Sequence, residues 1–161
     1  MDRQPTCHNS VDALIEAEEQ CHKKITEVLG LRIGETSFLS VNGGRLNCVV
    51  WDIGALETGD QAGFPSDMYH FQGRLDLYNQ NRAALQRWIM RLLLSFPVNK
   101  WQGRSNELAA EGNVYCLRVA PQTQGIGEIT TKEMRNEKNV KVSDVFTASV
   151  IFDVVFSAKE E

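Results

Sequence analysis

The sequence lacks the features that identify several classes of protein. Its four cysteines are isolated, with no pair in the CxxC spacing of zinc or redox sites, and no serine lies in a GxSxG element. The longest apolar stretch, near 88–96, contains Arg91 and is far shorter than the roughly 20 residues that cross a bilayer. The first ten residues have no apolar core of the kind found in a signal peptide. We therefore expect an intracellular protein with reduced thiols and no membrane partner.

Basic residues are not in excess either. The chain carries 17 lysines and arginines against 21 aspartates and glutamates, which argues against a protein that binds nucleic acid directly and sequence-specifically. The charge is uneven, because residues 1–80 hold six basic and twelve acidic side chains and residues 81–161 hold eleven and nine. Halves of opposite sign could attract one another between subunits, although a chance asymmetry would look the same.

Helix signals occur in two places. In the first, apolar residues recur at helical spacing from Val11 to Leu29, with Ser10 as a good N-cap and Gly30 as a C-cap. In the second, residues 85–96 show the same spacing after an Asn-Gln-Asn stop at 79–81, and Pro97 ends the pattern. Both segments are predicted to be amphipathic helices.

Strand signals occupy much of the remaining chain. We predict a hairpin across 36–53, an alternating strand at 68–78, a short strand at 114–120 and a further one within 126–135. The segment 145–157 is largely apolar on both faces, which is typical of a central or interface-forming strand. The expected fold class is α+β, a mostly antiparallel sheet with two main helices packed on it. A single domain would span 10–157, between a flexible arm at 1–9 and a frayed tail at 158–161.

The segment 54–67 is polar and rich in glycine, which is typical of a functional or flexible loop. Too little apolar surface is present for it to order itself alone, so we expect it to be mobile in the free subunit and ordered in an assembly. The residues of this expected assembly loop are Gly59, Asp60, Gly63, Phe64 and Pro65.

The sequence contains no residue pattern that strongly predicts a metal site or a catalytic site. Cys7-His8 and Cys21-His22 would lie about 21 Å apart on one helix, so they cannot converge on a zinc ion, and we expect no metal or cofactor. His70 could pair with Cys48 or Cys116 across a sheet, but a single histidine on a polar strand face is more often solvated. A small-ligand-binding or enzymatic domain with a pocket near His70, Cys48 and Trp51 remains the alternative interpretation.

Two groups of residues could form a subunit interface. The second predicted helix carries Arg82, Arg87 and Arg91, which form either a solvated face or a contact for an acidic partner. Such a partner could be the Glu-rich first helix of a neighbouring subunit, through Glu16 and Glu19. On the last strand, one face includes Val145, Ile151 and Val155, which would be left at an interface if no helix covers them. Together these groups predict a head-to-tail contact, and such contacts close into rings when the rotation permits.

The order of these elements resembles the tail terminator, or tail completion, proteins of long-tailed bacteriophages. The resembling parts are the capped first helix, the strand LNCVVWDI with its loop, the unit MYHFQGRLDLYNQNRAALQRWIMRLLLSFP and the closing strand VFTASVIFDVVF. The resemblance implies a structural virion protein and not an enzyme. It would form a homo-oligomeric ring, commonly of six subunits, that caps the tail tube and offers a surface to the head. Its implied partners are the tail tube and head-completion proteins, and its place is the tail or neck of a virion assembled in the host cytoplasm. A third interpretation is an adaptor or secretion-machine component on a related fold.

Overall fold

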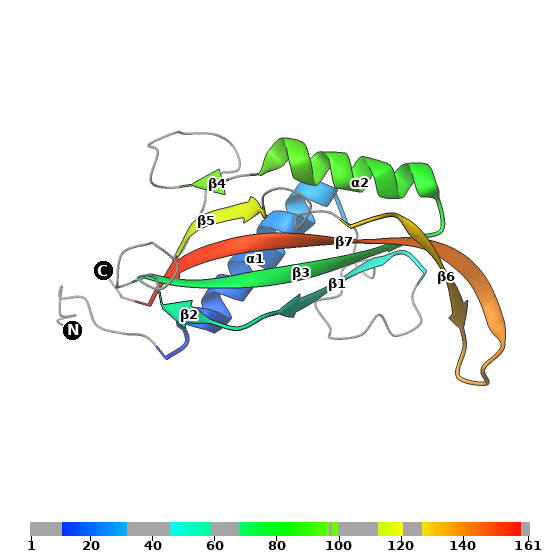
Figure 1. Ribbon diagram of the computed structural model, residues 1–161, viewed down its shortest axis with the longest axis horizontal. Coiled ribbons are helices and arrows are strands. Elements are labelled where there is room, and N and C mark those ends of the chain that lie inside the picture. The colour runs from blue at the N-terminus through cyan, green and yellow to red at the C-terminus, as the bar shows by residue number, and fades with distance from the viewer. Residues whose placement is uncertain are drawn as a thin grey trace.

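The computed structural model describes residues 11–31, 46–58, 68–96, 98–99, 113–120 and 127–158. Within them, two helices pack on one face of an antiparallel sheet (Figure 1), so the expectation of a mostly antiparallel sheet carrying two helices is confirmed. The predicted arm at 1–9 lies outside the described residues. In chain order the elements are α1 (Ala13–Leu29), β1 (Cys48–Ile53), β2 (Glu57–Thr58), β3 (Met68–Asn79), α2 (Arg82–Ser95), β4 (Val98–Asn99), β5 (Val114–Val119), β6 (Thr130–Arg135) and β7 (Lys141–Ser157).

Strand β7 is the centre of the sheet. One of its edges pairs with β3 over residues 146–157, and its other edge is shared by β5 and β6. Strands β1 and β2 both pair with the far edge of β3, and β4 pairs with β5. The central position predicted for 145–157 is therefore confirmed, and the strand begins four residues earlier, at Lys141.

Two predicted segments are described only in part. The strand expected from Leu46 to Ile53 appears as β1, but it pairs with β3, and the proposed hairpin partner within 36–45 lies outside the described residues. Of the loop expected at 54–67, Glu57–Thr58 form β2 against β3. Residues 59–67, which contain all five residues of the expected assembly loop, also lie outside the described residues.

Helix α1 begins and ends near the predicted positions. Its N-cap is Asp12, without a side-chain capping bond, and Ser10 lies outside the described residues. Gly30 has φ of 65°, the left-handed conformation that glycine adopts most readily at a helix C-terminus, so this C-cap is confirmed. The buried stripe includes Ala13 and Ala17, small residues that let the helix lie close to the sheet.

Three residues in or just before α1 differ from their predicted positions. Val11 is 96% exposed and Ile15 is 57% exposed, although the helical spacing placed both on the core face. Lys24, expected on a polar face, is only 4% exposed and its ammonium group lies 3.8 Å from Glu27. A lysine can bury its aliphatic stem along apolar surface while its charged end keeps polar contacts, and composition does not reveal that choice.

Helix α2 follows β3 directly. Asn81 caps it, since its side chain accepts a hydrogen bond from the backbone N–H of Ala84, as the Asn-Gln-Asn stop predicted. Its buried residues are Leu85, Trp88, Ile89 and Leu92. Leu93, predicted to be on the same face, is 41% exposed.

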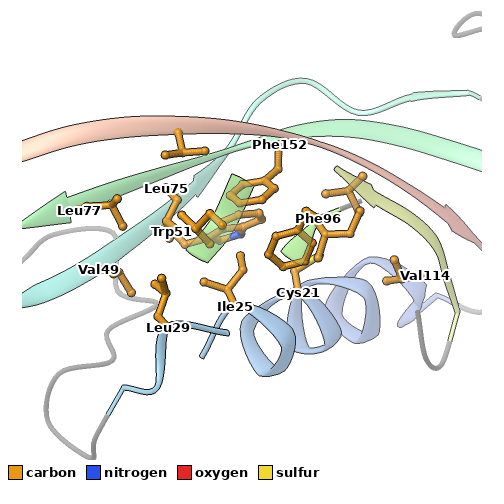
Figure 2. Packing of buried hydrophobic residues seen from close by; sticks show 14 of the residues in the cluster. Cys21, Ile25, Leu29, Val49, Trp51, Leu75, Leu77, Phe96, Val114 and Phe152 are labelled. Carbon is orange, nitrogen blue, oxygen red and sulfur yellow. The ribbon is translucent and has the colours of Figure 1, made fainter. Parts of the chain in front are cut away.

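The core fills the space between the helices and the sheet (Figure 2). Trp51 lies at its centre, edge-on to Phe71 at 6.5 Å and tilted against Phe152 at 6.3 Å between ring centroids. Its indole covers Gly73 of β3 so closely that a Cβ on Gly73 would lie 2.1 Å from Cη2 of the ring. Glycine at 73 is therefore required for this position of Trp51.

The last strand does not leave three residues uncovered. Val145 and Val155 are buried within the chain, at 0% and 1% exposure, and Ile151 is partly buried. Val155 packs with Met68 and Cys116 in a second, smaller cluster on the sheet face opposite the helices. Ala158, predicted to begin a frayed tail, is also buried, whereas 159–161 lie outside the described residues.

Candidate functional site

A polar network occupies the face of the sheet opposite the helices. His70 on β3 has its Nδ1 2.6 Å from Glu57 Oε1 and its Nε2 3.1 Å from Asp153 Oδ1. Asp153 also accepts hydrogen bonds from Gln72 Nε2 at 3.2 Å and from Arg118 Nε at 3.4 Å. The network joins four strands, β2, β3, β5 and β7, around one buried carboxylate.

The geometry of this network fits a structural role. Both ring nitrogens of His70 face carboxylates, so an imidazolium donates to both, whereas a neutral ring donates to only one of them. Cys116 lies on the same face, but Val155 stands between it and His70 in the sheet register. Burial raises the pKa of the Cys116 thiol, against the opposing effect of Arg118, and so disfavours the nucleophilic thiolate. These residues do not form a nucleophile–base pair.

The fold does not bring together His70, Cys48 and Trp51, the three residues of the alternative pocket. Cys48 pairs with Tyr78 in the register, eight residues along β3 from His70, or about 26 Å at the rise of a strand. Trp51 points to the opposite face of the sheet, into the core. The three residues predicted to share a pocket are separated by the length and the thickness of the sheet.

A groove with a volume of about 330 Å³ lies between α1 and β1. Its helix side is the N-terminal half of α1 and its strand side is the end of β1. The lining residues are Ile15, Glu18, Glu19, His22, Trp51, Asp52 and Ile53. Trp51 Nε1 donates a hydrogen bond to Glu18 Oε1 at 3.1 Å, which fixes the two walls relative to each other.

The groove is acidic with apolar surface at one side. Its lining includes the acidic side chains of Glu18, Glu19 and Asp52 and no lysine or arginine, although Asp52 also pairs with Arg74 at 3.9 Å. Burial lowers the pKa of His22, so this side chain is neutral at neutral pH and does not offset the carboxylates. Ile15 contributes exposed apolar surface. The groove therefore suits a partner that carries both positive charge and apolar side chains.

Strands β6 and β7 form a hairpin that extends beyond the body of the molecule. Strand β3 ends opposite Phe146, whereas β7 starts at Lys141, so residues 132–145 continue past the end of β3 as a two-stranded ribbon. Figure 1 shows this ribbon passing the end of α2 and curving away from it. At its tip Val140 and Val142 are 56% and 55% exposed, and residues 135–141 include three basic side chains and one acidic one.

The turn of this hairpin is held by its own polar groups. Asn136 Oδ1 accepts hydrogen bonds from the backbone N–H groups of Lys138 and Val140. Asn139 adopts φ of 61°, a left-handed conformation that asparagine tolerates, and Arg135 Nη1 donates to its carbonyl oxygen at 2.9 Å. The ribbon is thus shaped before it meets any partner.

No protein-family model matches the chain, and a search of curated proteins finds no match. Among the described residues, no group of three or more histidine, cysteine, aspartate or glutamate side chains is arranged to hold a metal ion. Neither of the two described helices is long and apolar enough to cross a membrane.

The three arginines of α2 differ in their surroundings. Arg91 Nη1 donates to the carbonyl oxygen of Leu29 at 2.9 Å, so its charge serves the C-terminal end of α1 in the same chain. Arg82 and Arg87 are exposed on the same helix. On α1, Glu16 and Glu19 are exposed, and Glu19 lines the groove. The predicted basic set is therefore divided, because Arg91 has a contact within its own chain, and the role of the set at a subunit interface stays a prediction.

Sequence reasoning missed the groove and the projecting hairpin. The turn at 136–139, with two asparagines among charged residues, was a usable signal for the hairpin. The valines at 140 and 142 alternate with Lys141 and Ser143, which is a further strand signal. The groove has no comparable local signal, since its walls are some 30 residues apart in the sequence.

Proposed function

We propose that the chain is a structural virion protein of a long-tailed bacteriophage, one subunit of a ring that caps the tail tube and joins it to the head. The ring is a homo-oligomer, commonly of six subunits. Its partners are the tail tube protein and a head-completion protein, and it acts without catalysis, metal or cofactor. It would be part of the tail or neck after assembly in the host cytoplasm.

The observation that carries the proposal is the projecting hairpin. A two-stranded ribbon standing alone is marginal in water, yet this one extends past the sheet with two valines exposed at its tip. Burying such side chains against a neighbour is favourable by roughly 1.5 kcal/mol or more each before ordering costs. An assembly subunit uses such an element, and the resemblance in element order supplies the kind of assembly.

The mass of the protein in solution tests the proposal. A ring predicts one discrete oligomer, favoured by high concentration, with a mass near six times the 18.1 kDa subunit. An enzyme or ligand-binding domain would more often be a monomer or a two-fold dimer. A chain that remains monomeric at every concentration, alone and with tail tubes, would contradict the proposal.

A further inference from the structure

Two surfaces of the molecule have complementary properties. One is the tip of the β6–β7 hairpin, residues 135–142, which carries two exposed valines and the exposed Lys138, whereas its other two basic side chains, Arg135 and Lys141, pair with acidic residues of the same hairpin. The other is the groove between α1 and β1, which carries the exposed Glu19 beside the exposed Ile15, whereas Asp52 pairs with Arg74 and Glu18 accepts the bond from Trp51. The hairpin tip offers positive charge and apolar side chains, and the groove offers negative charge and an apolar wall, so the two surfaces are complementary.

The two surfaces cannot meet within one molecule. Figure 1 places the hairpin at one end of the long axis, whereas the beginning of α1 and the end of β1 lie toward the other. A contact between them must therefore join two copies, and it uses different surfaces on each copy. Such a heterologous contact leaves a free hairpin and a free groove at its two ends, so it repeats, and it closes a ring when the rotation between copies permits.

We propose that the hairpin tip of one copy seats in the α1–β1 groove of the next copy, with Val140 and Val142 against Ile15 and Lys138 facing Glu19. This inference rests on the proposed function, because it names the contact that builds the ring. It replaces the pairing of the acidic helix with the arginines of α2, one of which is already bound to the end of α1.

The shapes of both surfaces are fixed in advance. The hairpin turn is held by the two hydrogen bonds to Asn136 Oδ1, and its base is anchored by the buried Met134 and Val145. The walls of the groove are joined by the bond from Trp51 to Glu18. Preformed partners lose less conformational entropy on binding, so a small contact repeated around a ring is sufficient for assembly.

A charge-swap experiment tests the contact. Lys138→Glu and Glu19→Lys each place like charges against each other, so each single variant should associate about threefold to thirtyfold more weakly at low salt, by sedimentation or mass photometry. Lys138 and Glu19 both lie on the surface of the subunit, so folding should be unaffected, which circular dichroism verifies. The double variant restores opposite charges across the contact and should regain most of the lost affinity.

Arg87→Glu is the matched control, because Arg87 is an exposed basic residue outside both surfaces. It should associate as wild type does. Val142→Asp removes apolar contact and should weaken association at high salt as well, where the charge variants recover. In mixed samples of Lys138→Cys and Glu19→Cys treated with a thiol oxidant such as diamide, an intermolecular disulfide should form between the two variants, and the covalent link identifies the contact after the subunits are denatured.

The outcomes separate the two proposals. If the protein forms rings but the hairpin variants assemble as wild type does, the proposed hairpin contact is wrong and the proposed function is not contradicted. The same conclusion follows if Arg87→Glu is the variant that fails to assemble. If hairpin-dependent association gives open chains that never cap a tail tube, the contact is right and the proposed function is wrong. Failure of the double variant to recover, with no disulfide formed, also overturns the contact.

Discussion

Replacing Gly73 by alanine should destabilise the protein, although the same change in an ordinary strand is favourable by roughly 0.5–1 kcal/mol. The new Cβ would lie 2.1, 2.4 and 2.8 Å from three carbon atoms of the Trp51 ring. No small adjustment relieves three such contacts with a rigid ring that is held between Phe71 and Phe152. Trp51 must leave its position, and its hydrogen bond to Glu18 is lost with it.

The magnitude follows from what Trp51 buries. Removing a large aromatic side chain from a core costs about 3–5 kcal/mol, and overpacking a core costs about 1–3 kcal/mol. Since a displaced ring retains part of its burial, we expect Gly73→Ala to lower the free energy of unfolding by about 3 kcal/mol. The groove should be disturbed as well, because Trp51 and Glu18 form two of its walls.

The change in the free energy of unfolding is measured by urea denaturation, with circular dichroism as the signal, from the shift of the transition midpoint. Gly54→Ala is the control, since its added Cβ would meet only the carbonyl oxygen of Gln72 at 3.5 Å, an ordinary contact. The double variant Gly73→Ala/Trp51→Leu should cost less than the sum of the two single changes. A neutral or stabilising Gly73→Ala, or strict additivity in the double variant, would refute the reasoning.

Three further predictions follow from other contacts. Arg91→Ala should lower the free energy of unfolding by about 1 kcal/mol, because the carbonyl oxygen of Leu29 loses its charged donor, whereas Arg87→Ala should change it by less than about 0.5 kcal/mol in the same urea titration. His70→Leu should cost about 1–3 kcal/mol, because the buried Asp153 loses a donor, and an unchanged thermal midpoint would argue against the network. Burial raises the pKa of Cys21 far above its ordinary value near 9, so above about pH 9 the unfolded thiol loses its proton while the folded thiol keeps it, and the free energy of unfolding falls as pH rises. The Cys21→Ala variant should be less stable at neutral pH, but its free energy of unfolding should fall less steeply as the pH rises. A fall as steep as that of wild type would show that Cys21 is not the cause.

The parts of the fold that depend on local signals could be predicted from the sequence. Asn81 caps α2 and Gly30 ends α1 because both act within a few residues of the chain. The double-sided apolar pattern of 145–157 indicated a central strand, which is where β7 lies. These features can be predicted without knowing which other elements pack against them.

The parts that depend on register and contact could not be predicted. The covering of Gly73 by Trp51 joins two strands whose pairing no local pattern specifies. The hairpin projects only because β3 ends opposite Phe146 while β7 continues back to Lys141. Arg91 looked like a free surface charge until the end of α1 was found beside it. The predicted grouping of His70 with Cys48 and Trp51 was wrong for the same reason. Strand register and the face of the sheet on which a side chain lies decide which residues are neighbours, and neither is specified by a local pattern.

The most direct test of the central claim is electron microscopy of gold-labelled protein mixed with bacteriophage tail tubes, the partner that the proposed function names. We expect label at one end of each finished tube, as a ring, and none along its length. We also expect the Lys138→Glu variant to lose the ring and the charge-swapped double variant to regain it. Tubes that carry no label, or label spread along their sides, would contradict the claim that this protein caps the tail.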